Sequence, residues 1–161
     1  MILAAPHEVA TSVAHNFQQP QVRKYPKMNE KIETKAGVGI DALIVVQALL
    51  DAENAHDVEA AVALFSDDAV VDLAVETRSG KAAIRAWQEE LAQGNFHMRV
   101  RNAPQVDGSH VRFDNTLDLD MFKQMNLGTV DGVSEAIVNQ GKIISYRFSL
   151  TPEFAAKLSG Q

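Results

Sequence analysis

Cysteine is absent from this 161-residue sequence, and so is any hydrophobic run that approaches the length of a membrane span. Without cysteine there is no disulfide framework, no thiolate nucleophile and no cysteine-based metal site. Without roughly 20 consecutive apolar residues we expect no membrane partner and a cytoplasmic location. Basic residues are also scarce, since 15 Lys and Arg stand against 21 Asp and Glu for a formal net charge of -6. This balance disfavours nucleic acid as a partner, because a surface that binds it must neutralise phosphates.

The rest of the composition fits a single folded domain, preceded by a segment that differs from it in charge and proline content. Hydrophobic residues make up 46% of the chain, and a domain of this length can bury roughly 70% of its unfolded surface. Residues 1–39 carry five Lys or Arg against three Asp or Glu and hold three of the five prolines, whereas residues 40–161 carry ten against eighteen. We therefore predict an extended or disordered tail over residues 1–39, with Met28 as an alternative start site, and one domain over residues 40–161.

Helical periodicity predicts three helices in the first half of that domain. Residues 40–55 form a segment that is too long for a typical strand and that would be apolar around most of a helix. This pattern indicates a buried helix. Asp57 can cap a second helix. After a short β-branched strand over residues 69–74, a third helix places Ile84, Trp87 and Leu91 on one face, with Gly94 just beyond its end.

Beyond Gly94 the pattern alternates between apolar and polar residues, as in strands with one buried face. Asp107-Gly108 and Asn139-Gln140-Gly141 are hairpin turn signals between these runs. Thr151-Pro152 can cap a short last helix. Helices followed by antiparallel strands indicate an α+β fold, in which three helices cover the concave face of a curved antiparallel sheet of four or five strands and leave a pocket.

Three segments carry a resemblance to a known superfamily. They are NAHDVEAAVALFSDDAVV at residues 54–71, SGKAAIRAW at residues 79–87 and GKIISY at residues 141–146. In this order they resemble the nuclear transport factor 2-like superfamily, which includes SnoaL-like polyketide cyclases, ketosteroid isomerases and limonene-epoxide hydrolases. The likeness covers about residues 40–158 and implies a cone-shaped, cystatin-like roll. This fold hosts enzymes, ligand binders and assembly modules, so it does not define a function.

The positions that carry chemistry in those relatives are mostly aliphatic or aromatic here. The resemblance places Leu49 and Leu73 where the isomerases have a tyrosine and an aspartate base, and Phe148 where the hydrolases and cyclases have an aspartate. The second acid of the isomerases falls at Ser134 or Glu135, and the register of this strand stays open. The catalytic sets of the relatives are therefore absent from the matched positions.

Two polar residues remain as candidates in the apolar pocket. The resemblance implies that Tyr146 on the last strand points inward, and Asn115 is the one polar residue within the apolar alternation from Val111 to Leu119. Either they orient a ligand or take part in catalysis, or Tyr146 packs in the core while Asn115 ties down the backbone. We predict that a ligand contacts six residues. They are Trp87, Phe113, Asn115, Leu117, Tyr146 and Phe148.

Glu135 is a third catalytic candidate, because a carboxyl inside an apolar cone would have a raised pKa and could transfer protons. The alternation is ambiguous there, and the more common arrangement is an outward Glu135 that pairs with Arg147 or Arg101. Asp72 has the same ambiguity, since it faces the pocket only if the strand contains a bulge.

The sequence offers no pattern for a metal or a cofactor. Its five histidines show no ligand spacing on one element, and Gly37-Val38-Gly39 follows no strand, so we expect neither. A row of charged residues on the strands predicts a polar outer sheet face, either solvated or a dimer interface. The row consists of His97, Arg99, Arg101, His110 and Arg112 opposite Asp114, Asp118 and Asp120. The resemblance implies a homodimer through this face.

Two functions are consistent with these features of the sequence. The first is a SnoaL-like pocket protein that binds a small, mostly apolar molecule, with or without acid–base activity of the isomerase, cyclase or hydratase type. The second is a non-catalytic dimerisation or protein-interaction module with a filled cone. A cavity of about 300 Å³ or more with two convergent polar groups would favour the first, and a cone plugged by Trp87, Phe113 and Phe148 the second.

Overall fold

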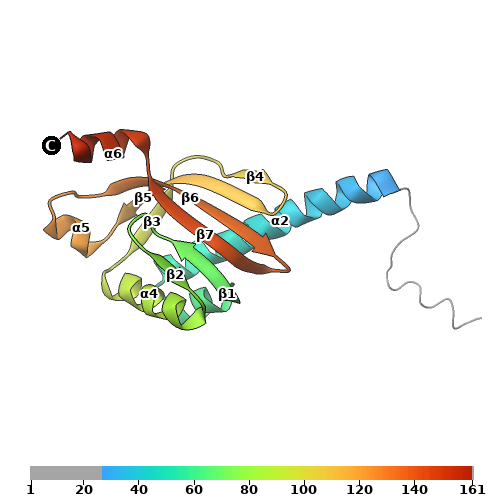
Figure 1. The fold of residues 1–161 in the computed structure, drawn as a ribbon, viewed down its shortest axis with the longest axis horizontal. Helices are drawn as coiled ribbons and strands as arrows, with labels where there is room; N and C mark the ends of the chain where they lie inside the picture. Colours follow the sequence, from blue (N-terminus) through green and yellow to red (C-terminus); the bar gives the residue numbers. More distant parts are fainter. Residues whose placement is uncertain (1–26, 161) are drawn as a thin grey trace, which may run out of the picture. The chain divides into compact units, whose positions relative to one another are not determined.

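Helix α2 (Lys27–Asn54) is the first element of the computed structural model, which describes residues 27–160 (Figure 1). The helix begins thirteen residues before Ile40, so the prediction of an extended or disordered segment is wrong for residues 27–39. The stretch from Met28 to Lys35 contains no proline and consists mainly of good helix formers, and two glycines then weaken the helix without breaking it. The prediction for residues 1–26 lies outside the described residues. Residues from Ala36 onward form one compact unit.

The next two helices agree with the sequence pattern. Helix α3 (Val58–Ala63) begins where the Asp57 side chain accepts a hydrogen bond of 3.0 Å from the Ala60 N–H. Helix α4 (Lys81–Gln93) ends at Gly94, whose N–H bonds back to the last turn. Both caps were predicted from local residue types, and both are confirmed.

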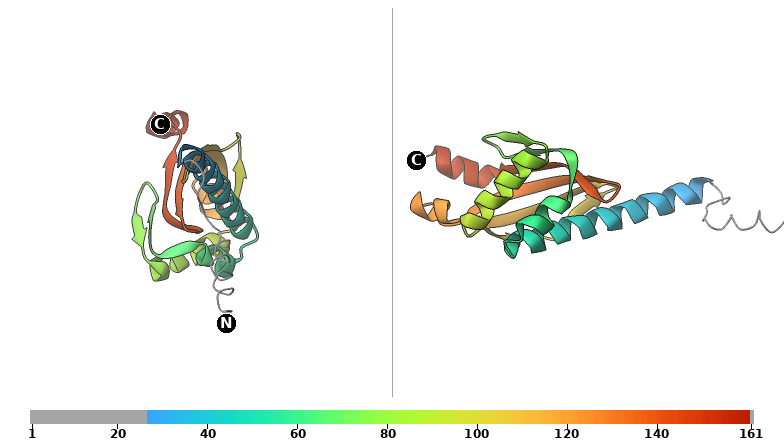
Figure 2. Two further views of the ribbon diagram at one scale, coloured as in Figure 1. Left: turned by 90° about the vertical axis from the view of Figure 1, so that its right-hand side faces the viewer. Right: turned by 90° about the horizontal axis from the view of Figure 1, so that it is seen from below.

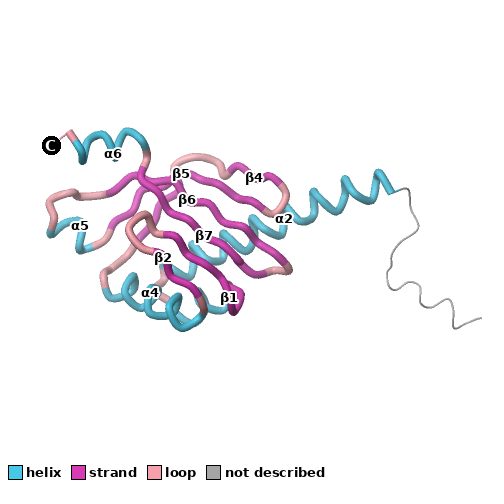
Figure 3. Tube along the Cα trace, viewed as in Figure 1, coloured by secondary structure: helices cyan, strands magenta, loops and turns pink. Residues whose placement is uncertain are grey.

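The sheet has seven strands and is antiparallel with one exception. The strands are β1 (Phe65–Asp72), β2 (Thr77–Ser79), β3 (His97–Val100), β4 (Gln105–Asp107), β5 (His110–Asp118), β6 (Val130–Asn139) and β7 (Lys142–Leu150). Their order is β2-β1-β7-β6-β5-β3, with β4 also paired to β5, and among these described strands only β1 and β7 run parallel. Figure 3 shows β1, β7, β6 and β5 side by side in magenta. The α+β class with a curved, mostly antiparallel sheet is confirmed. The expected four or five strands are too few, because β2 and β4, at three residues each, are too short to show an alternating pattern.

Two short helices follow β5 and β7. Helix α5 (Asp120–Gln124) was not predicted, because five residues are too few to show a helical period. Helix α6 (Pro152–Ser159) begins as expected, with the Thr151 hydroxyl accepting a 3.1 Å hydrogen bond from the Phe154 N–H. Within residues 27–160, no helix combines the length and the hydropathy that crossing a bilayer would require.

Residues 36–54 of α2 lie with α3 and α4 along one face of the curved sheet (Figure 2). The core between these layers is a single cluster that includes Val46 and Leu49 of α2, Ile84 of α4, and Val111 and Ile143 of the sheet. One glycine shapes the sheet locally, because a Cβ on Gly132 would lie only 2.1 Å from the Phe148 ring. The bare backbone of β6 therefore lets this ring lie across it, toward one end of the sheet.

Candidate functional site

A cavity of about 630 Å³ opens at the end of the sheet where α5 and α6 lie. Side chains from α2, α4, β3, β5, β6, β7, α5, α6 and the β1–β2 loop contribute to its wall. Most of this wall is apolar: Leu73, Val75, Trp87, Leu91, Phe96, Met98, Leu117, Leu119, Met121, Phe122, Met125, Leu127, Val130, Phe148, Leu150, Phe154 and Leu158. The ionisable residues in the wall are Glu53, Glu76, Glu90 and Tyr146. The cavity therefore suits an apolar molecule that also carries a polar group.

Glu53 brings a carboxyl group into this apolar wall. It lies on α2, is only 4% exposed, and its Oε1 accepts a 2.7 Å hydrogen bond from Nε2 of Gln88 on α4. Its other oxygen, Oε2, is buried and has no hydrogen-bond partner among the described residues. Burial raises the pKa of Glu53 to about 7, and the Gln88 bond opposes part of that rise. Near neutral pH this carboxyl can therefore be either protonated or charged.

Tyr146 lies in the same wall but directs its proton away from it. The ring is 2% exposed, and the hydroxyl donates a 2.9 Å hydrogen bond to Oγ of Ser134 on β6. Ser134 Oγ also accepts a 2.8 Å bond from Nδ2 of Asn115 on β5. Burial, and next the charge of Glu53, raise the pKa of Tyr146, so its phenol stays neutral. With its proton bonded to Ser134, the phenol oxygen can accept a hydrogen bond from a ligand.

The structure brings together four of the six predicted ligand contacts, since Trp87, Leu117, Tyr146 and Phe148 all line the cavity. Phe113 and Asn115 are buried in the core and are not in its lining. Alternation along β5 correctly gives their face of the sheet, but the cavity reaches only the last part of that strand. Asn115 is linked to the cavity indirectly, through Ser134 and Tyr146.

Glu135 lies outside the cavity, on the outer face of β6. Its Oε2 is 3.6 Å from Nε2 of His110 and 3.8 Å from Nε of Arg112. The neighbouring residues Ser134 and Ala136 are fully buried, so the alternation of the strand turns Glu135 outward. Of the two orientations left open by the sequence, the structure has the outward one, with partners other than those expected.

Asp72 also faces away from the cavity wall. Its Oδ2 lies 3.4 Å from Nε of Arg147, which is opposite Asp72 on the neighbouring parallel strand β7. The register break in β1 falls earlier, between Phe65 and Val70, so it does not turn Asp72 inward. This ion pair also occupies the arginine that was expected to pair with Glu135.

Sequence reasoning missed Glu53 and its partner Gln88. A signal was present, because Glu53 continues the buried face of α2 that contains Ala42, Val46 and Leu49 at helical spacing. Its place near the end of the helix suggested a solvated residue instead. Leu49, at the position of the isomerases' tyrosine, is fully buried in the core, four residues before Glu53.

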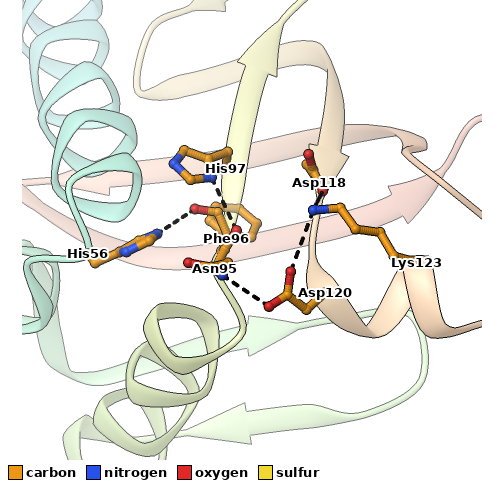
Figure 4. Close-up of polar contacts among 7 residues, drawn as sticks. All are labelled: His56, Asn95, Phe96, His97, Asp118, Asp120 and Lys123. Carbon is orange, nitrogen blue, oxygen red and sulfur yellow. Dashed lines mark hydrogen bonds and ion pairs between the residues drawn. The ribbon is translucent and has the colours of Figure 1, made fainter.

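Polar contacts fix the elements beside the cavity (Figure 4). His56 has a positive φ of 58° in the turn after α2, and its Nε2 lies 2.8 Å from the Phe96 carbonyl oxygen. Asn95 donates a 3.0 Å hydrogen bond to Asp120 at the start of α5, and Lys123 contacts the same carboxylate at 3.5 Å. These bonds join the turn after α2, the loop before β3 and the start of α5.

Comparison with known proteins places this architecture among a large group of related folds. A family model described as SnoaL-like domain matches residues 46–146, which is more than half of the chain. No curated protein sequence matches the chain.

Three solved structures illustrate the likeness in fold. An NTF2-like protein of unknown function from Cytophaga hutchinsonii has a TM-score of 0.58 at 15% identity, over 70% of this chain and 91% of that one. The epoxide hydrolase/cyclase-like enzyme SalBIII, from pyran ring formation in salinomycin, has a TM-score of 0.62 at 19% identity, over 70% and 92%. A computationally designed 17-OHP binder has a TM-score of 0.59 at 22% identity, over 71% and 93%. At these identities the likeness is one of fold.

Proposed function

This chain belongs to the SnoaL-like domain family, and from that premise we propose that its cavity binds a small, mostly apolar molecule. The observation that carries this proposal is an open volume of about 630 Å³ with an apolar wall that contains Glu53 and Tyr146. A cavity of this size is typical of sites that enclose most of a small ligand.

The same observation argues against a filled cone that serves only as an interaction module. Trp87 and Phe148 form part of the wall and leave the volume open, while Phe113 packs in the core. The Trp87 ring lies against the Tyr146 ring, with centroids 5.9 Å apart. Similar folds support the proposal, since one neighbour is a designed binder of 17-OHP.

A second candidate function is acid–base catalysis in the same cavity, of the isomerase, cyclase or hydratase type. Glu53 favours it, because a carboxyl with a pKa of about 7 is suited to accept and return a proton at neutral pH. Tyr146 is less suited to donate a proton to a ligand, because its hydroxyl already donates to Ser134. Turnover by the wild type that Glu53→Gln abolishes would support this candidate.

Ligand binding can be tested by thermal shift with steroid, terpenoid and polyketide-like fragments, since a ligand of the folded state raises the melting temperature. We expect apolar fragments to stabilise the wild type, and Leu91→Trp, which fills part of the cavity, to weaken that effect. Ile137→Trp is the matched control, because Ile137 is 38% exposed and lies outside the wall. Equal shifts in the two variants would contradict binding in this cavity.

A further inference from the structure

The cavity wall contains carboxyl groups but no basic side chain among the described residues. Its acidic residues are Glu53, Glu76 and Glu90, and no Lys, Arg or His belongs to the wall. Two of the three carboxylates are already paired, because Arg78 lies 2.5 Å from Glu76 and 3.0 Å from Glu90. Glu53 therefore supplies negative charge to this wall without a cationic partner in it.

Only one of the two carboxyl oxygens of Glu53 has a hydrogen-bond partner among the described residues. Gln88 holds Oε1 with a neutral amide, and Oε2 accepts nothing from the described residues although it is buried. A buried carboxylate that lacks a partner is costly, so a positive group brought into the cavity gains more than it would at the surface.

We propose that the cavity selects lipophilic amines, whose ammonium group pairs with Oε2 of Glu53 while their apolar body lies against the wall around Trp87 and Phe148. This inference rests on the proposed function and adds the chemical class of the ligand.

An ammonium group matches the acceptor oxygens of Glu53 and Tyr146 better than an alcohol or a carboxylate does. It has donors only, and both Oε2 of Glu53 and the phenol oxygen of Tyr146 can accept, because the Tyr146 proton is directed to Ser134. An alcohol forms a neutral hydrogen bond or donates to the carboxylate without adding charge, so it gains less. A carboxylate ligand would place a second negative charge beside Glu53.

The pH dependence of binding depends on the hydrogen-bond partner of Glu53 and on the other ionisable groups of the cavity wall. These are the neutral Gln88 and the paired Glu90 on α4, the neutral Tyr146 on β7, and the paired Glu76 in the β1–β2 loop. Burial raises the pKa of Glu53 to about 7, so below pH 7 it is mostly protonated and cannot form the ion pair. Affinity for an amine therefore rises from pH 5.5 to pH 8, whereas affinity for an alcohol changes little.

Three probes with one tricyclic skeleton test this selection: dehydroabietylamine, the corresponding alcohol and dehydroabietic acid. Trp87, the single tryptophan of the chain, lines the cavity, so its fluorescence reports binding directly. At pH 8 we expect the amine to bind about 10-fold tighter than the alcohol, as for one charge-assisted hydrogen bond, and the acid to bind most weakly. Glu53→Gln should bring the amine-to-alcohol ratio to about 1, whereas the control Glu135→Gln on the outer face should preserve it.

The outcomes separate the two proposals. If the alcohol binds the wild type as tightly as the amine, or if Glu53→Gln keeps the preference, the selection of amines is overturned and the apolar binding site remains. If none of the three probes binds, the proposed function is overturned as well. If Glu53→Gln does not fold, the wild type still decides, because an amine-to-alcohol ratio that does not fall between pH 8 and pH 5.5 contradicts the role of Glu53.

Discussion

At the scale of single residues, the buried carboxyl of Glu53 makes the stability of the fold depend on pH. The pKa of Glu53 is raised from its ordinary 4.5 to about 7 by burial in the folded protein. Between these values the folded state keeps a proton that the unfolded chain has released, so this residue's contribution to the free energy of unfolding falls as pH rises. The full difference corresponds to about 3 kcal/mol, present below pH 4.5 and lost above pH 7.

We therefore expect Glu53→Gln to be more stable than the wild type at pH 7.5 by about 3 kcal/mol, and close to it at pH 4.5. Glutamine keeps an oxygen that can accept from Gln88 and never becomes charged. Urea unfolding at the two pH values measures the difference. Glu135→Gln is the control with the same loss of charge, and a stability gain of Glu53→Gln that is the same at both pH values would contradict a titrating carboxyl at this position.

The Ser134 hydroxyl is the hydrogen-bond acceptor for two buried side chains. It accepts from Tyr146 at 2.9 Å and from Asn115 at 2.8 Å, and all three residues are buried. Ser134→Ala should cost about 2 kcal/mol of unfolding free energy, because it leaves two buried donors without a partner. A double-mutant cycle with Tyr146→Phe should give a coupling of about 1 kcal/mol. Strictly additive effects in denaturant unfolding would show that this hydrogen bond contributes nothing.

At the scale of secondary-structure elements, the contact between β6 and β7 controls the shape of the cavity. A Cβ on Gly132 would lie 2.1 Å from the Phe148 ring and 2.9 Å from the Ser149 carbonyl oxygen. Gly132→Ala should therefore displace the ring and cost about 1–3 kcal/mol of stability. Gly37→Ala in α2 is the control, since nothing lies within 4 Å of its position and alanine favours helix, by about 1 kcal/mol. Thermal unfolding that ranks the two variants in the opposite order would contradict this role of Gly132.

The elements also show which features a sequence can reveal. Asp57, Gly94 and Thr151 act on residues within one turn, so their caps were predicted correctly. The parallel pairing of β1 with β7 joins segments about 75 residues apart and has no local signal. The start of α2 was missed because residues 27–39 lack an apolar face that would mark a helix.

The sequence predicted part of the candidate site, as it predicted part of the fold. Alternation along β5 identified the inward face that contains Leu117, and the family resemblance identified Tyr146 and Phe148; all three line the cavity. Alternation could not tell how far along β5 the cavity extends, so it also included Phe113. Glu53 was missed because a helical face alone does not show whether it borders a packed core or an open volume.

At the scale of the whole molecule, the predicted homodimer through the outer sheet face stays a prediction. Charged side chains on this face form pairs within one chain, such as Arg112 with Asp114 at 3.9 Å and Arg101 with Asp131 at 4.0 Å. These separations are long, and the side chains are 31–42% exposed, so a second copy can still compete for them.

If that face is a two-fold interface, the solution mass should be about twice 17.6 kDa, as light scattering coupled to size-exclusion chromatography measures it. Arg112→Glu should then give a monomer, because each substitution occurs twice in a two-fold contact and places a new negative charge beside Asp114 and Glu135. Lys142→Glu is the control with the same change of charge, since Lys142 bonds the Ala63 carbonyl oxygen and not an acidic side chain of the outer face. A wild type that is monomeric at about 100 μM, a concentration well above the micromolar range of ordinary stable contacts, would rule out the dimer.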